Sequence, residues 1–81
     1  MRLSVEQSRA ARVLLNWTAD DLAHAAGLGI ATVKRFESGR PVAEASVDAL
    51  SDALVTAGIM LLSAGEPSPD GGRGVRLKRS G

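Results

Sequence analysis

The sequence has 81 residues and a formal net charge of +1, with 44% hydrophobic but only 2% aromatic residues. A chain of this length forms one domain with a small core, here aliphatic and alanine-rich, as short, closely packed helices require. Cysteine is absent, which excludes disulfides and thiolate metal sites. No apolar run approaches the ~20 residues that span a bilayer, and no secretory leader is visible, so we expect a cytoplasmic protein.

Charged residues are distributed unevenly along the chain. Glu44, Asp48 and Asp52 recur at helical spacing, so they would line one side of a helix. Basic residues gather in two other places, namely Lys34, Arg35 and Arg40, and then Arg73, Arg76, Lys78 and Arg79. This distribution predicts a basic side that suits nucleic acid and a second side with a different role.

A first helix is expected over residues 5–15. Ser4 is a good N-cap, and Gln7 occupies the capping-box position three residues later. The residues expected to face the core are Ala10, Ala11 and Leu14, with Leu3 and Val13 as further candidates.

Residues 18–37 predict two short helices joined by a tight turn. Thr18 is a good N-cap, followed by acidic residues in the first turn, where the helix dipole favours them. Gly27 suits the left-handed conformation that ends a helix. The inward positions at helical spacing are Leu22, Ala23 and Ala26 in the first helix and Val33 and Phe36 in the second. Because small Ala23 lets the two helices approach closely, this pattern predicts a helix-turn-helix.

The second half of the chain changes from helix to strand. Gly39 and Pro41 end the second short helix, and a fourth helix is expected over residues 44–57 with Val47, Leu50, Leu54 and Ala57 on its buried side. Residues 59–62 read as a strand, residues 66–72 as a loop, and residues 74–78, which alternate apolar and basic, as a second strand. The two strands could pair as a hairpin; the alternative is a disordered basic tail after Leu62.

The helix-turn-helix segment resembles that of the Xre family, which includes the phage repressors and Cro-like regulators. The matching residues are Trp17-Thr18, Asp21-Leu22-Ala23, Ala26-Gly27-Leu28, Ala31-Thr32-Val33 and Phe36-Glu37-Ser38-Gly39-Arg40. The resemblance implies a mainly α fold: a four-helix repressor-like helix-turn-helix domain in residues 1–58. Residues 59–81 would add a short C-terminal β-hairpin or strand extension with a basic tail. In the family, the residues at the positions of Arg12 and Glu37 form an ion pair, so the resemblance implies one here. The alternative is that both residues are ordinary surface charges.

The same resemblance implies which residues would meet DNA. The recognition helix, about residues 29–38, would enter the major groove and contact base edges with Gly29, Ile30, Ala31, Lys34 and Arg35. The phosphate contacts would come from Thr18, Ala19, Ser38 and Arg40. Arg35 can donate two hydrogen bonds to guanine, whereas Ile30 and Ala31 can only pack on a thymine methyl. Shape readout and backbone N–H contacts to phosphates would add to this direct readout.

These observations favour a sequence-specific transcriptional regulator that binds a palindromic operator as a homodimer. The hairpin is expected to supply the dimer interface through Ile59, Leu61, Val75 and Leu77, unless it folds back on its own helices. The alternatives are a helix-turn-helix domain repurposed to bind another regulatory protein, as an antiactivator or antitoxin-like partner, and a non-specific nucleic-acid binder.

Enzymatic and metal chemistry find no support in the sequence. His24 is the only histidine and stands between alanines, so it has no partners for a metal site or a nucleophile–base pair. Residues 71–74 lack the lysine and hydroxyl that complete a phosphate-binding loop. We expect no enzyme activity, no metal and no cofactor.

Overall fold

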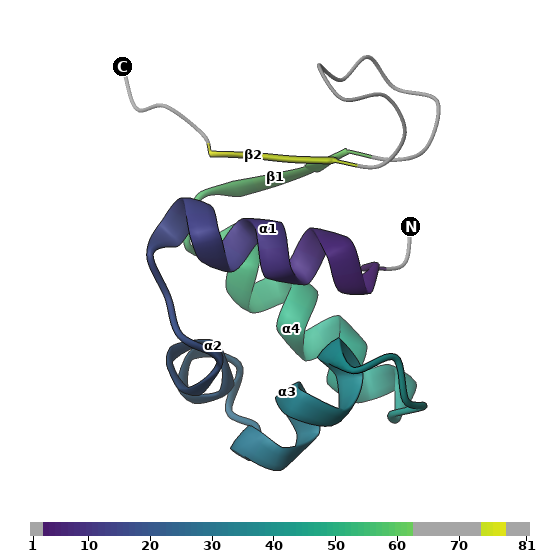
Figure 1. The fold of residues 1–81 in the computed structure, drawn as a ribbon. Helices are drawn as coiled ribbons and strands as arrows, with labels where there is room; N and C mark the ends of the chain where they lie inside the picture. Colours follow the sequence, from purple (N-terminus) through teal and green to yellow (C-terminus); the bar gives the residue numbers. More distant parts are fainter. Residues whose placement is uncertain (1–2, 63–73, 78–81) are drawn as a thin grey trace.

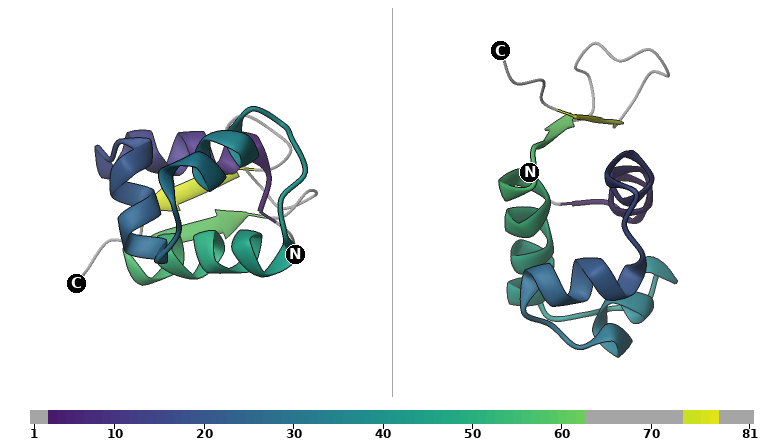
Figure 2. Two further views of the ribbon diagram at one scale, coloured as in Figure 1. Left: turned by 90° about the horizontal axis from the view of Figure 1, so that it is seen from below. Right: turned by 90° about the vertical axis from the view of Figure 1, so that its left-hand side faces the viewer.

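Four helices precede a β-hairpin in the computed structural model, which describes residues 3–62 and 74–77. The elements are α1 (Val5–Leu15), α2 (Ala19–Ala26), α3 (Ile30–Glu37), α4 (Glu44–Thr56), β1 (Ile59–Leu62) and β2 (Gly74–Leu77). Figures 1 and 2 show α1 and α4 in the middle of the molecule, with the hairpin at one end and α2 and α3 at the other. The predicted fold class, mainly α with a C-terminal hairpin, is confirmed. None of the described helices has the length and apolar character needed to cross a bilayer.

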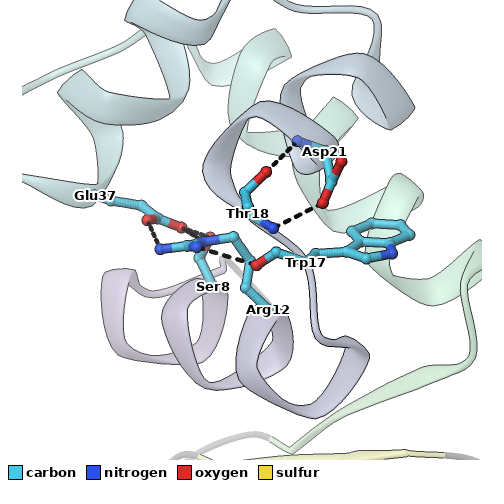
Figure 3. Close-up of polar contacts among 6 residues, drawn as sticks. All are labelled: Ser8, Arg12, Trp17, Thr18, Asp21 and Glu37. Atoms are coloured by element: carbon cyan, nitrogen blue, oxygen red, sulfur yellow. Dashed lines mark hydrogen bonds and ion pairs between the residues drawn. The ribbon is translucent and has the colours of Figure 1, made fainter.

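Capping boxes begin the first two helices. The Ser4 hydroxyl accepts a hydrogen bond from the Gln7 N–H (3.1 Å), and the Gln7 side chain accepts one from the Ser4 N–H (3.0 Å). Thr18 and Asp21 exchange the same two bonds at 3.1 and 2.9 Å, as Figure 3 shows. Each box satisfies two N–H groups that a helix start leaves without partners, which confirms both predicted N-caps.

The core lies where the helices meet. Its hydrophobic members, all buried, are Leu3, Ala11, Leu22, Ala23, Val33, Phe36, Val47, Leu50, Leu54 and Ile59. The predicted inward residues Leu22, Ala23, Val33 and Phe36 are therefore confirmed, and Trp17 packs against this core from a half-buried position. Leu28, after the turn, packs against it as well.

The inward face of α1 differs from the prediction. Ala10, Val13 and Leu14 are exposed, with Val13 79% exposed, whereas Gln7 and Ser8 are buried. These two polar side chains can lie inside because each is hydrogen-bonded, Gln7 in the capping box and Ser8 to the Glu37 carboxylate. The helix thus buries a face on which two of the three buried residues are polar, which an apolar pattern does not reveal.

The two strands pair antiparallel, as predicted. The register sets Ile59 opposite Leu77 and Leu61 opposite Val75, and Lys78 of the predicted second strand lies outside the described residues. The alternative of a disordered tail after Leu62 therefore does not hold for Gly74–Leu77. The predicted loop over residues 66–72 lies outside the described residues.

The hairpin folds back on its own helices. Ile59 is completely buried, Leu61 packs against the core, and β2 lies against α1. Ile59 already packs within one chain, so its burial gives no support to the predicted dimer interface at or beside Ile59, Leu61, Val75 and Leu77, which stays a prediction. A boundary after Gly58 would also divide residues that share one core.

Candidate nucleic-acid interface

The turn between α2 and α3 fixes the angle of the two helices. Gly27 adopts the left-handed conformation with a φ of 70°, and the Leu28 N–H donates to the Ala23 carbonyl at 2.9 Å. A side chain disfavours this conformation, so glycine suits the position. Ala23 of α2 and Val33 of α3 are both buried in one core, and the two helices pack against each other.

Since Val33 and Phe36 point inward, the opposite face of α3 meets solvent. All five residues predicted to contact bases are exposed on and just before this helix, namely Gly29, Ile30, Ala31, Lys34 and Arg35. In the helix itself, two side chains of this face carry positive charge and none carries negative charge.

A part-buried polar network ties the end of α3 to α1. The Arg12 guanidinium donates to both Glu37 carboxylate oxygens (2.7 and 3.1 Å), the Ser8 hydroxyl donates to Glu37 at 2.6 Å, and Arg12 also donates to the Trp17 carbonyl at 3.2 Å (Figure 3). The two charged side chains are only 22% and 9% exposed, so solvent screens the pair weakly. The network confirms the ion pair that the resemblance implied. It fixes α3 relative to α1, and it balances the negative charge of Glu37, the one carboxylate on α3.

Comparison with protein-family models decides the identity of this arrangement. Residues 9–54, more than half of the chain, match a helix-turn-helix family model. The chain belongs to the Xre-type helix-turn-helix family. This family supports a role as a DNA-binding regulator of transcription. A comparison with individually curated proteins finds no match.

Helix α3 of this Xre-type domain begins without a side-chain cap. Its N-cap is Gly29, and the Gly29 carbonyl accepts from the N–H groups of Thr32 and Val33. Within the described residues, the N–H groups of Ile30 and Ala31 have no acceptor. These donors stand at the positive end of the helix dipole, with no acidic residue in the first turn to compete for them.

The residues predicted to contact phosphates differ in whether their hydrogen-bond donors are already used within the protein. Thr18, Ser38 and Arg40 are exposed, whereas Ala19 is half-buried. The Ser38 hydroxyl donates a hydrogen bond to the Arg35 carbonyl at 3.0 Å, and the Ser38 backbone N–H donates one to the Lys34 carbonyl. The Arg40 guanidinium has no protein partner in the part of the chain that the structure describes, so it is the stronger candidate for a phosphate.

A groove that the sequence did not predict lies between α2 and α4. It measures about 520 Å³ and is lined by Trp17, Asp52, Thr56 and five alanines. Figure 3 shows the Trp17 ring directed toward α4. Ala49, Ala53 and Ala57 recur at four-residue spacing, which puts them on one side of α4 and its end, but only the packing shows that they face Ala25 and Ala26 of α2.

Residues 3–62 and 74–77 contain no group of three histidine, cysteine or carboxylate residues that could hold a metal ion, and His24 is exposed on α2. The described interface offers a ligand hydrogen-bond donors, positive charge and apolar contact.

Proposed function

We propose that the protein is a sequence-specific transcriptional regulator whose helix α3 reads base edges in the major groove. The supporting observation is the exposed face of α3, where Lys34 and Arg35 lie beside the uncapped helix start. The Arg12–Glu37 ion pair supports the proposal too, because it keeps a carboxylate from facing the DNA phosphates. The Arg35 guanidinium can donate two hydrogen bonds to guanine, and exposed Arg40 would contact a phosphate.

Two arginine substitutions should separate base reading from backbone contact. Arg35→Ala is expected to relax the preference at one base pair and to weaken specific binding by about 1–3 kcal/mol. Arg40→Ala should weaken binding to specific and random duplexes alike. It should also reduce the slope of log affinity against log salt concentration by about one. Both side chains are exposed, so the fold should survive either change. Mobility shifts on an operator selected from a random duplex library measure both effects; unchanged preference in Arg35→Ala would contradict its assignment.

We further propose a homodimer on a palindromic operator. The recognition helix has eight residues and is about 12 Å long, so one copy covers few base pairs. Two copies would present two such helices about 34 Å apart. The hairpin and α3 lie at opposite ends of the folded molecule (Figures 1 and 2), so stacking two hairpins would direct the recognition helices away from each other. The flank of α1, with exposed Val13 and Leu14 and the adjacent strand β2, suits the interface better.

Sedimentation of the protein on the selected duplex tests this dimer. We expect two chains per palindrome, and one chain when half of the palindrome is scrambled. Val13→Asp should leave the fold intact, because the residue is 79% exposed, and should halve the mass of the free protein. If the Val13→Asp protein remains dimeric, the dimer interface does not lie on the flank of α1.

A protein-binding role is the second candidate, and the groove between α2 and α4 favours it. Asp52 lines the groove, and exposed Glu44 and Asp48 continue the acidic side of α4. Such a surface would suit a basic, partly apolar segment of another regulator, as in an antiactivator or antitoxin-like pair. If this is the main role, selection from a random duplex library will enrich no sequence.

A further inference from the structure

The first turn of α3 exposes apolar side chains where a DNA-reading helix usually offers polar ones. Ile30 is 36% exposed, Ala31 is exposed, and the N-cap before them is Gly29, which has no side chain. Neither residue is among the buried residues of the core or the apolar residues packed against it, so both are available to a ligand. A ligand that covers them gains the free energy of burying their apolar surface.

The major groove of DNA offers one kind of apolar surface. Base edges there present hydrogen-bond donors and acceptors, except for the methyl group on C5 of thymine. A cytosine that carries a C5 methyl presents the same group at the same place. An apolar helix start that enters the groove therefore gains more at a methylated pyrimidine than at an unmethylated one.

We propose that Ile30 and Ala31 form a methyl-reading patch that recognises the C5-methyl group of a pyrimidine in each half-site. This proposal rests on the proposed binding of α3 in the major groove. The patch does not distinguish the source of the methyl group, so cytosine methylation in the half-site raises affinity as thymine does. The uncapped N–H groups of the same two residues add hydrogen-bond donors at this point.

The helix geometry also sets where this pyrimidine lies relative to the guanine. Arg35 follows Ala31 by four residues on the same exposed face, a rise of about 6 Å along the helix. Bases along one strand rise about 3.4 Å each, so the methyl group and the guanine are about two base pairs apart or closer. The half-site thus contains a methylated pyrimidine near the guanine that Arg35 contacts.

Deoxyuridine substitution tests the patch, because it removes only the methyl group. Each thymine of the selected operator is replaced singly, and binding is measured by fluorescence anisotropy. We expect one or two positions per half-site to lose about three- to fivefold in affinity, the order for one buried methyl group. In a second set of duplexes, cytosine replaces thymine at those positions, and C5-methylation of that cytosine should restore a similar factor.

A double-mutant cycle assigns the effect to the protein side. In Ile30→Ala the loss caused by deoxyuridine should shrink toward twofold or less, while Val55→Ala, a control at an exposed apolar position on α4, should keep the full loss. No sensitive thymine in the wild-type protein, or an equal loss in Ile30→Ala, would overturn the methyl-reading patch while leaving DNA reading intact. If no duplex binds better than random DNA, the proposed function and this inference both fail.

Discussion

Val33→Glu is expected to unfold the protein and not merely to abolish DNA binding. Val33 is completely buried between α2 and α3. An unpaired carboxylate there would cost several kcal/mol, whereas a small domain is stabilised by only about 5–15 kcal/mol in total. Far-ultraviolet circular dichroism during heating measures the loss of the helical transition.

The neighbouring residue provides a matched control. Lys34 follows Val33 on α3 and is exposed. Lys34→Glu should therefore melt within a few degrees of the wild type, while its reversed charge weakens binding to any duplex. A cooperative wild-type melt in Val33→Glu would mean that the assigned inward face of α3 is wrong.

Ile59→Ala should destabilise the protein strongly although the residue lies beyond the four helices. Its side chain is completely buried in the same core as Leu50 and Leu54. Removing it should lower the free energy of unfolding by about 2–4 kcal/mol, as for other large-to-small core changes. Urea denaturation followed by circular dichroism measures the difference.

Met60 is the control, because it is the next residue of β1 and 38% exposed. Met60→Ala should change the free energy of unfolding by less than about 1 kcal/mol. Truncation after Gly58 should be at least as damaging as Ile59→Ala, since it removes the whole hairpin from α1 and α4. A chain of residues 1–58 with wild-type stability would show instead that the hairpin is a separate unit.

Local signals made the helices predictable from the sequence. The capping pairs Ser4–Gln7 and Thr18–Asp21 mark two helix starts, and Gly27 marks the turn; each acts within a few residues of the chain. The strands were recognisable for the same reason. The side on which the hairpin would pack was not, because the buried position of Ile59 depends on helices far away in the sequence.

In the candidate site, too, local features were predictable from the sequence and contacts between distant residues were not. The exposed face of α3 follows from the spacing of Val33 and Phe36, and the likeness to the Xre family implied the Arg12–Glu37 pair. The misassigned face of α1 has a physical reason, since polarity predicts exposure only where no partner is available. Ser8 has such a partner 29 positions along the chain, the Glu37 carboxylate, and no local pattern could show it.

The most direct test of DNA reading compares the selected palindromic operator with a random duplex of equal length over a series of salt concentrations. We predict that both affinities fall as salt rises, and that near physiological salt the operator binds at least about 10³-fold more tightly than the random duplex. Equal affinities for the two duplexes at every salt concentration would contradict sequence-specific regulation by this helix-turn-helix protein.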